Sequence, residues 1–423
     1  MLAALMIIAL DFTHLIQFIA LGGTIPNGNP PTSAFIVEFA SYGLCVLILM
    51  LDTRSAARLL RKGIFAWAVA TVGLFTWGML VRAFDSPAGI DDYYFLHAFG
   101  IQVHYIAFLV SCVFIFDQPN TLALARRAVA VATIAGVVLN IYDLIHPGVF
   151  SRQPGRASGL YVNPNGSGMA LVLGCIVGLP ALRRRWSREA FFLVISVGVL
   201  ATFSRMAIVS LILVMVVASI AGVWSVTRLF LMICGVMVLL VGLNLARDLR
   251  EHQIGRIAPG VDFATIFRLY EDSSVQERVD LAQNAVEEFR EAPLLGHGFG
   301  TTIFWTVGNV SHNYYLSLLT DYGIFGIVLI PALVLSIRRP GWEYYAFAGT
   351  LLLFLFFNSE LLNDPMGVVC IAIEADEASM LTISRPGRLA GVAGVYSAAQ
   401  LRRDLSDPYR GQTTGPASIL FRE

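Results

Sequence analysis

The chain has 423 residues, of which 57% are hydrophobic and only 14% are charged, and its mean hydropathy is +0.70. A soluble globule of this length needs more polar surface, so the composition excludes that class and indicates a polytopic membrane protein. The 29 basic and 29 acidic side chains cancel formally, which leaves no overall field that would attract nucleic acid.

Apolar stretches of about 17 to 25 residues can cross a hydrocarbon core of about 30 Å as helices, because lipid does not tolerate unpaired backbone groups. The sequence therefore predicts an all-α fold. On this criterion we expect about eleven transmembrane helices, which begin near residues 1, 34, 63, 98, 127, 164, 190, 206, 229, 313 and 344.

The predicted helices divide the chain into four segments. These are N-terminal transmembrane helices over 1–246, a large outer loop over 247–312, C-terminal transmembrane helices over 313–362, and a tail over 363–423. The topology of the tail is left open, because Glu374 and two further acidic residues follow its apolar start at once.

Basic residues in short loops predict the orientation, because arginine and lysine near span ends accumulate on the cytoplasmic side. Such groups occur in the loops at 54–62, 126–127, 183–188 and 338–339. They alternate correctly with the predicted spans, so we expect a cytoplasmic N-terminus and an outward-facing 247–312 loop. The first apolar stretch has no basic flank and no clear cleavage site, so we expect no cleavable signal.

The sequence shows no metal-binding pattern and no disulfide framework. Neither an Asp-x-Asp motif nor a cluster of histidines and cysteines occurs in an outer loop. The five cysteines occur singly in apolar segments, at Cys45, Cys112, Cys175, Cys234 and Cys370. We interpret four of them as small hydrophobic helix residues and leave Cys370 open. We expect neither a metal nor a cofactor.

One helix is predicted inside the large outer loop. Ser274 and Glu277 form a capping box, and apolar residues repeat at helical spacing behind it, at Val275, Val279, Ala282, Val286 and Phe289. Pro293 and the glycines at 296, 298 and 300 end this amphipathic helix. Arg278 flanks the apolar stripe, either as a residue that snorkels at the membrane surface or as part of a site.

The segment from Arg156 to Gly166 opens the sixth predicted span from the outside. Asn163, Pro164 and Asn165 combine a proline suited to the first helical turn with turn-forming neighbours, so a helix N-terminus points outward. Such an end favours anions. The alternative is a plain helix start with incidental glycines.

Arg205 and His312 are the other candidates. Arg205 lies between two apolar runs, where its guanidinium either snorkels to the interface or presents two donors to phosphate oxygens. His312 precedes Asn313, and histidine titrates near neutral pH, which suits a general base or acid. A hydrogen-bonded boundary histidine is the alternative. Asp321 is another possible base, although its place within a span favours a structural role.

The four candidates Arg156, Arg205, Arg278 and His312 lie far apart in sequence but fall on the same side of the predicted membrane. Only folding could bring them together. Because three of them are permanently charged cations, this placement predicts one outward-facing site for an anionic, diphosphate-bearing substrate.

This ordered set resembles the bacterial O-antigen ligase and polymerase superfamily. The resemblance covers about residues 150 to 335. Its motifs are Arg-x-x-Gly with Asn-Pro-Asn, Ser-Arg after a span, Ser-x-x-x-Arg and Gly-x-Gly-x-Gly in a large outer loop, and His-Asn-x-x-Leu followed by Gly-x-x-Gly. It implies that Arg156, Arg205 and Arg278 engage the diphosphate of an undecaprenyl-linked glycan, and that His312 activates the acceptor hydroxyl.

The same resemblance implies further properties. Asn163, Asn165 and Asn313, within the matching motifs, are expected to bind substrate, and the acceptor is expected to be a glycan or lipid A-core. The family implies a metal-independent reaction, a GT-C-like helical fold of about twelve spans, and a place in the bacterial inner membrane with the active site toward the periplasm. The chain departs from the family in its tail after Asn363.

Other readings remain open at this stage. A transporter or flippase of lipid-linked glycan would also carry intramembrane polar groups, here Asp11, His14, Glu38, His104 and Asp143. Such a transporter is expected to show repeated halves, and we find no internal repeat. An intramembrane serine protease using Ser167 and His312 is disfavoured, because Asn165 stands where the Gly-x-Ser-Gly pattern needs glycine. A structural or sensor protein would not require the ordered arginines and histidine.

Overall fold

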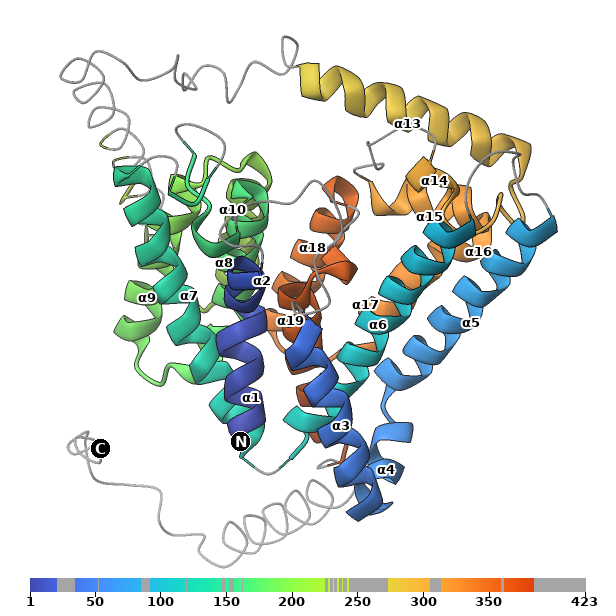
Figure 1. Cartoon of the computed structure of the whole chain (residues 1–423). Coiled ribbons are helices and arrows are strands. Elements are labelled where there is room, and N and C mark those ends of the chain that lie inside the picture. The colour runs from blue at the N-terminus through green and yellow to red at the C-terminus, as the bar shows by residue number, and fades with distance from the viewer. Residues whose placement is uncertain are drawn as a thin grey trace, which may run out of the picture. The chain divides into compact units, whose positions relative to one another are not determined.

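The computed structural model of the chain describes residues 1–20, 35–51, 53–84, 92–118, 120–146, 149–151, 156–161, 163–224, 273–304, 313–358 and 361–383, with single positions between 227 and 242. These described residues are largely helical and contain no strand (Figure 1). One compact unit runs from Met1 to Glu377, and a second unit, 378–423, starts within the last helix, α19 (Pro365–Ile383).

Four helices among the described residues are long and apolar enough to cross a membrane. They are Gly63–Phe84 (α5), Phe95–Phe116 within α6 (Asp92–Phe116), Thr121–Ile145 (α7), and Pro164–Ala181, which extends α8 (Pro164–Gly178) by a 3-10 turn. Shorter apolar helices accompany them. The prediction of an all-α polytopic membrane protein is confirmed.

The shorter helices lie on both sides of these four in the sequence. The N-terminal part adds α1 (Leu2–Ile7), α2 (Leu15–Ala20), α3 (Ile36–Leu51), α4 (Thr53–Leu60), α9 (Arg185–Ala201) and α10 (Arg205–Ile220). The C-terminal part adds α13 (Ser273–Glu291), α14 (Thr301–Phe304), α15 (Tyr314–Tyr322), α16 (Ile324–Ile327), α17 (Leu329–Ser336) and α18 (Trp342–Phe357). The span predicted near residue 229 falls mostly outside the described residues.

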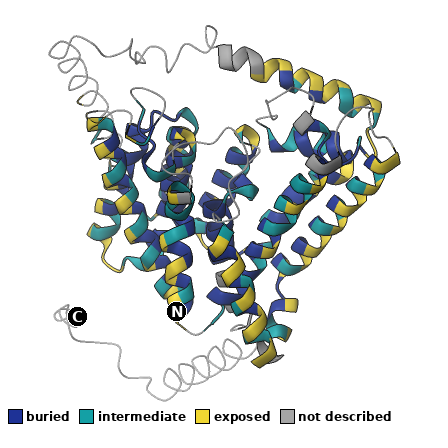
Figure 2. Ribbon diagram, in the orientation of Figure 1, coloured by how far each residue is buried: buried dark blue, intermediate teal, exposed yellow. Residues whose placement is uncertain are grey.

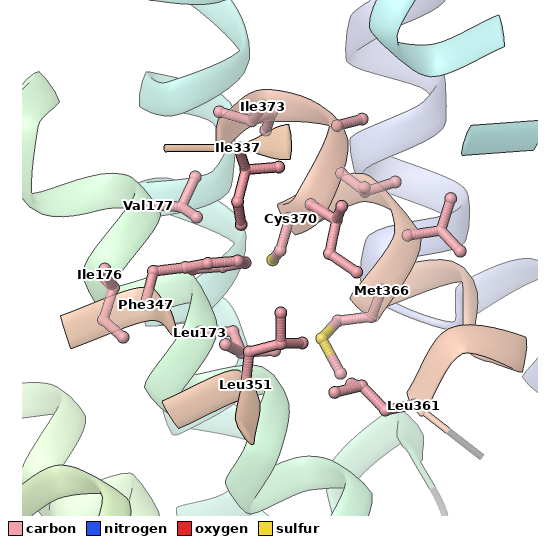
Figure 3. Close-up of a cluster of buried hydrophobic side chains, with 14 of the residues drawn as sticks. Leu173, Ile176, Val177, Ile337, Phe347, Leu351, Leu361, Met366, Cys370 and Ile373 are labelled. Carbon is pink, nitrogen blue, oxygen red and sulfur yellow. The ribbon is translucent and has the colours of Figure 1, made fainter. Parts of the chain in front are cut away.

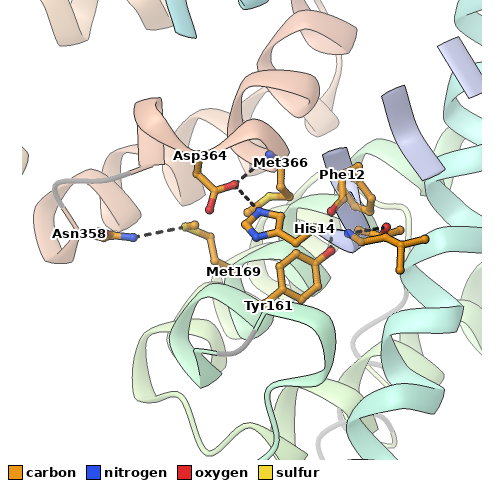
Figure 4. Close-up of polar contacts among 9 residues, drawn as sticks. Phe12, His14, Tyr161, Met169, Asn358, Asp364 and Met366 are labelled. Atoms are coloured by element: carbon orange, nitrogen blue, oxygen red, sulfur yellow. Dashed lines mark hydrogen bonds and ion pairs between the residues drawn. The ribbon is translucent and has the colours of Figure 1, made fainter. Parts of the chain in front are cut away.

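The predicted first span is broken rather than continuous. After α1 the chain forms a π-helix over Ile8–Phe12, and His14 then adopts a left-handed φ of 57° before α2 begins. The Tyr161 hydroxyl holds the break by donating a hydrogen bond to the Phe12 carbonyl oxygen at 2.7 Å (Figure 4). Burial raises the pKa of Tyr161 well above its usual range, so this hydroxyl remains a donor.

The helix predicted from residue 313 is also broken, so the prediction of a single element was wrong. Gly323 ends α15 with a φ of 61° and a ψ of −151°, a conformation that residues other than glycine rarely adopt. A side chain at this position would also collide with the Leu294 carbonyl group, 2.4 Å from an added Cβ. The chain therefore turns at Gly323, and the apolar helix that follows runs over Ile324–Ser336.

The tail beyond Asn363 begins with a helix, α19. The sequence left this segment open because acidic residues at 374–377 lower its hydropathy. All of its residues over 366–375 are buried. Figure 3 shows Met366 and Cys370 of α19 beside Phe347 and Leu351 of α18. Cys370, which the sequence left open, is a buried free cysteine, and Glu374 lies between two buried arginines, Arg126 and Arg339.

The contacts between helices in this core are stabilised by close packing rather than by the hydrophobic effect. Lipid tails are as apolar as leucine, so helices in a membrane associate through van der Waals packing and interhelical polar contacts. Small residues permit that closeness here. An added Cβ at Gly178 of α8 would stand 3.0 Å from the Ala130 Cβ of α7, and one at Gly174 would stand 2.3 Å from the Thr133 Oγ1.

The outer-loop helix exists, but its buried face differs from the predicted stripe. In α13 the buried side chains are Leu281 and Ala285, whereas Val279 and Val286 are 42% and 37% exposed. Figure 2 shows the described part of this helix as largely exposed, with shorter buried stretches between. The reason is the packing partner. α13 lies against α15, where the Thr320 hydroxyl donates to the Ala285 carbonyl oxygen at 3.3 Å, and this contact selects a face one position away from the valines.

Candidate functional site at the N-termini of α8 and α10

Arg156 joins two connections that are distant in sequence. Its Nε donates to the Thr202 carbonyl oxygen at 3.1 Å, and its Nη2 donates to the Asn165 Oδ1 at 2.9 Å. The next residue reinforces the contact, because the Ala157 N–H donates to the Ala201 carbonyl oxygen at 3.0 Å. The segment before α8 is thereby fastened to the turn between α9 and α10.

The α8 N-terminus is built by the predicted Asn-Pro-Asn motif. Asn163 is the N-cap, its side chain accepts a hydrogen bond from the Asn165 N–H at 2.9 Å, and Pro164 occupies the first helical position. Proline suits that position because its missing N–H would have no partner within the helix anyway. The motif thus directs a helix N-terminus, which carries the positive end of the helix dipole, toward Arg156.

The α10 N-terminus is formed by the very tight turn between α9 and α10. Phe203 turns the chain with a φ of 49°, which is strained for a residue with a large side chain. Ser204 then caps α10 by accepting from the Ala207 N–H at 3.5 Å, and Arg205 takes the first helical position. Arg205 is half-buried, so the snorkelling reading and the site reading both remain geometrically allowed.

The two helix ends lie against each other. α8 and α10 are in contact, and they cross at Gly168, where an added Cβ would lie 2.6 Å from the Ala207 Cβ and 3.1 Å from the Ser204 Cβ. The arrangement concentrates two helix N-termini and the guanidinium groups of Arg156 and Arg205 on one part of the molecule. Groups of this kind favour an anion, and paired arginine donors match the geometry of phosphate oxygens.

Two polar groups of α7 support this arrangement from beneath. Asp143 accepts from the N–H groups of Phe150, Ser151 and Ser158 at 2.8 to 3.3 Å, and so shapes the segment that leads to Arg156. Ser167 is 1% exposed and exchanges hydrogen bonds with the Asn140 side chain. Both contacts are structural. The hydrogen bonds of Asp143 therefore explain why this acid is buried. The contact with Asn140 is a further argument against Ser167 as a nucleophile.

Arg278 is exposed on α13, one turn beyond the part of that helix that packs. It precedes Leu281 by three residues and Ala285 by seven, so it continues the buried face of α13 toward the helix N-terminus. Its side chain therefore leaves α13 on the side that faces the rest of the protein. That direction had not been predicted, because the expected stripe was assigned to other residues.

His312 lies outside the described residues, and Asn313 is where the structure resumes. Asn313 is the N-cap of α15, and its Oδ1 accepts from the Leu316 N–H at 3.2 Å. Two residues on, the Tyr315 hydroxyl donates to the Leu352 carbonyl oxygen of α18 at 3.2 Å. α18 also packs against α8 and α10, so one helix connects the His-Asn motif with the helices of the arginine site.

The predicted site residues thus divide into three groups. Arg156, Asn163 and Asn165 are linked by direct hydrogen bonds, with Arg205 at the helix end beside them. Arg278 lies on α13. Asn313 caps α15, the element that follows the histidine.

A very small pocket lies beside the start of α15. Its volume is about 10 Å³, and its lining includes Tyr314 of α15 with Gln102 and Tyr105 of α6. The lining is otherwise mostly apolar, with Thr71 of α5 as a further polar group. The residue after the His-Asn pair therefore lines a space large enough for about one water molecule.

The Gly-x-Gly-x-Gly segment connects α5 with α15 through backbone hydrogen bonds. Gly296, Gly298 and Gly300 all have positive φ, and the Phe299 N–H donates to the Gly78 carbonyl oxygen of α5 at 3.0 Å. Asp321 of α15 accepts from the Gly300 N–H at 3.0 Å and from the Thr302 N–H at 3.1 Å. These contacts support the structural role expected for Asp321, and they show the glycines bound to protein.

One group of possible metal ligands was not predicted from the sequence. Glu288, Glu291 and His297 place one ligand atom each within 4.8 Å of one another at the end of α13. The signal is weak, because two glutamates three residues apart on a helix are common. His297 Nε2 already lies 3.0 Å from the Glu288 carbonyl oxygen, and Glu291 is exposed. The arrangement is adequately explained by fixing the loop after α13.

Comparison with known proteins matches one part of the chain. Residues 190–330 match the family model described as O-antigen ligase. This range contains Arg205, Arg278, His312 and Asn313, while Arg156 precedes it. No curated protein and no solved structure matched the chain. Residues 190–330 are therefore similar to the O-antigen ligase family, and this match supports the resemblance to the O-antigen ligase and polymerase superfamily that the sequence motifs indicate.

Proposed function

We propose that this protein transfers a glycan from an undecaprenyl diphosphate carrier to a hydroxyl group of an acceptor sugar, without a metal ion. The acceptor is a growing glycan or lipid A-core, and the reaction takes place at the periplasmic face of the bacterial inner membrane. The family match supports transfer of the ligase or polymerase type. The observation that carries the rest is the meeting of Arg156, Arg205 and two helix N-termini at the crossing of α8 and α10.

The proposed reaction needs a group that accepts a proton and groups that stabilise a leaving diphosphate. The acceptor oxygen attacks the anomeric carbon, the bond from that carbon to the phosphate oxygen breaks, and the acceptor proton moves to His312. The departing diphosphate keeps the electron pair. Arg156, Arg205 and Arg278 offset its charge, which arginine does without a metal because it stays protonated.

Preorganisation is the feature of this site that favours catalysis over simple binding. The guanidinium of Arg156 is oriented by Thr202 and Asn165 before any substrate arrives. A donor that is already in place does not have to be reorganised in the transition state, so its full interaction is available when charge develops. Asn163 and Asn165 act by shaping this end of α8, and Asn313 acts by starting α15 directly after His312.

Purified protein in detergent, supplied with a lipid-linked glycan donor and an acceptor, tests the proposal directly. Transfer by the wild type and its loss in Arg205→Ala and in Arg278→Ala are expected, with all proteins matched in thermal stability. Near-normal transfer by both variants would contradict the assignment of these arginines. Glycans from a deletion strain then separate the two products: free polymer with bare lipid A-core indicates a ligase, and single repeat units on the core indicate a polymerase.

A second candidate function is transport or flipping of a lipid-linked glycan. It is favoured by the broken first span and by Asp11 and Glu38, which are fully buried and have no hydrogen-bond partner in the part of the chain that the structure describes. Proteoliposomes distinguish it from the transferase. A flippase moves labelled lipid-linked glycan between leaflets and leaves its covalent structure unchanged, whereas a transferase lengthens or relocates the glycan.

A further inference from the structure

Two carboxyl groups in the N-terminal helices stand apart from every site described so far. Asp11 of the π-helix and Glu38 of α3 are both 0% exposed, and none of their four carboxyl oxygens has a hydrogen-bond partner among the described residues. The two groups interact with each other electrostatically. The π-helix follows directly on α1, and α1 packs against α3, the helix that carries Glu38.

Other buried acids of this protein are compensated. Glu374 lies between Arg126 and Arg339, Asp143 accepts from three backbone N–H groups, and Asp321 accepts from two. The chain therefore neutralises buried carboxylates with guanidinium or N–H groups where they serve the fold. Within the described ranges the carboxyl oxygens of Asp11 and Glu38 have no hydrogen-bond partner, so the burial of these two acids calls for a different explanation.

His14 interacts electrostatically with Glu38, but this histidine is shared with a second acid. It follows the π-helix, and its Nε2 lies 3.0 Å from the Asp364 Oδ1 (Figure 4). On α3 and α6 the Tyr42 hydroxyl bonds with His104 Nδ1 at 3.0 Å. The other groups that interact with the pair or with Tyr42 are Cys112 and Tyr105, which are neutral acids at physiological pH. One histidine shared with Asp364 cannot balance two ionised carboxylates.

The backbone at Asp11 has the form often found at binding sites. A π-turn inserts an extra residue into a helix, leaves the regular hydrogen-bond ladder, and occurs frequently at functional positions. Here the π-helix is followed by the left-handed His14 and the start of α2, so the helix is discontinuous next to an acid. Discontinuous helices with intramembrane carboxylates are the usual framework of small-cation sites in membranes.

Electrostatics then limits the state of the pair. Two ionised carboxylates in a low-dielectric interior, without donors or a counterion, carry a desolvation penalty and repel each other. A bound cation removes both difficulties. We propose that Asp11 and Glu38 form an intramembrane site for one small monovalent cation, either a proton shared by the carboxyls or an alkali-metal ion held between them.

The bound cation stabilises the position of the π-helix relative to α3, since its release leaves two negative charges that repel each other. Because the site is formed by residues distant from the arginine site, it does not depend on the proposed transfer reaction. Its test is therefore a measurement of stability rather than of activity.

The experiment compares unfolding of the full-length wild type in detergent with that of the double variant Asp11→Asn, Glu38→Gln. Amides mimic the protonated acids, so the variant is expected to fold. In the unfolded chain these carboxyls release their protons near pH 4. The folded site keeps one proton at neutral pH, so stability is present at low pH and is lost as pH rises, by about tenfold in the unfolding constant per pH unit for one proton.

Two arms of the same experiment identify the cation. With choline as the only added cation, a slope with pH that the double variant lacks indicates a proton. A rise in midpoint at alkaline pH on replacing choline by sodium, potassium or lithium, again absent from the variant, indicates a metal ion. Asp280→Asn, an exposed site on α13, is the matched control and is expected to keep the wild-type behaviour. Parallel curves for wild type and double variant in both pH and salt would overturn the proposal.

A measurement on the unmodified protein guards against a variant that fails to fold. A hydrophobic carbodiimide reacts with protonated carboxyls within a membrane, and mass spectrometry locates the adduct. Modification of Asp11 or Glu38 that declines at high pH or on addition of the alkali-metal ion is expected. Glu374, held by its arginines, is the internal control and is expected to remain unmodified. Absence of adduct on both Asp11 and Glu38 at every pH would also overturn the proposal.

Discussion

Glu374 and Arg339 meet at 2.7 Å between Oε2 and Nη2, with side chains that are 1% and 3% exposed. Arg126 supplies a second guanidinium, 3.3 Å from the Glu374 Oε1. Burial lowers the pKa of Arg339 from its usual value, and the neighbouring Glu374 carboxylate opposes that shift. These contacts fasten α19 to α7 and to the connection between α17 and α18, which is how an acidic residue is accommodated at the end of an apolar helix.

Removing the carboxylate should therefore destabilise the whole bundle. Glu374→Gln leaves two buried guanidiniums without their counter-charge, and we expect a loss of about 3 to 5 kcal/mol in the free energy of unfolding. Denaturation in mixed micelles measures it. Arg58→Gln is the control, because Arg58 is 41% exposed and Asp117 keeps Lys62 at 2.9 Å; a loss of about 1 kcal/mol or less is expected. Equal losses in the two variants would contradict the buried role of Glu374.

Arg156→Lys should impair transfer although it conserves charge. Lysine cannot reach both the Thr202 carbonyl oxygen and the Asn165 side chain with a planar fork. Loss of one hydrogen bond to a charged group corresponds to about 1.5 to 3 kcal/mol, or roughly a ten- to hundredfold fall in transfer rate. The rate is measured with saturating acceptor. Arg290→Lys, on the exposed side of α13, should leave it unchanged. A fully active Arg156→Lys enzyme would show that its fork is dispensable.

His312→Ala should abolish turnover while donor binding persists, because the proton acceptor and the diphosphate ligands are different groups. Binding of labelled donor and rate of transfer are measured on the same preparation. His146→Ala is the matched control, since His146 is an exposed histidine at the end of α7. Substantial turnover by stable His312→Ala protein would remove this histidine from the mechanism.

Transfer should tolerate EDTA, because the proposed charge stabilisation comes from arginines. The group Glu288, Glu291 and His297 offers the one alternative among the described residues that could hold a metal. Activity is measured with EDTA and after addition of magnesium or manganese, in wild type and in Glu291→Ala. Loss of transfer in EDTA with recovery on adding metal would contradict the proposal. If transfer by Glu291→Ala then failed to recover on adding metal, the metal would be assigned to the group that contains Glu291.

A single cysteine placed at Asp262 should react with an impermeant thiol reagent from the outside of the inner membrane. The prediction follows from the alternation of basic short loops along the chain. A cysteine at Arg61, exposed at the end of α4, should react only after the inner leaflet is breached. The reverse pattern would invert the topology and place the arginine site in the cytoplasm.

Hydropathy and local motifs accounted for much of this fold because they report on local properties. The helices beginning near 63, 164 and 206 and the cap at Asn163 all follow from residues close in sequence. The break at Gly323 did not emerge, since it depends on the approach of Leu294. α19 was hidden because the partner of Glu374 on α7 is 248 residues away.

The same distinction applies to the candidate site. Individual motifs indicated which residue types could handle a diphosphate, but not that Arg156 would reach the Thr202 carbonyl oxygen across 46 positions. The Gly-x-Gly-x-Gly segment could be recognised as a motif, but the sequence did not indicate which residues it contacts. Only the fold shows it bound to Gly78 and Asp321.

The missing side chain at Gly168 determines the spacing between the positive ends of α8 and α10. With a methyl group there, the Ala207 Cβ would be 2.6 Å away, so one helix would have to move. Gly168→Ala would then enlarge the gap between these ends without altering any charge. We expect the substitution to change which size of anion can touch both ends. Under the proposed function, selectivity between monophosphate and diphosphate leaving groups would then depend on a single hydrogen atom in place of a methyl group.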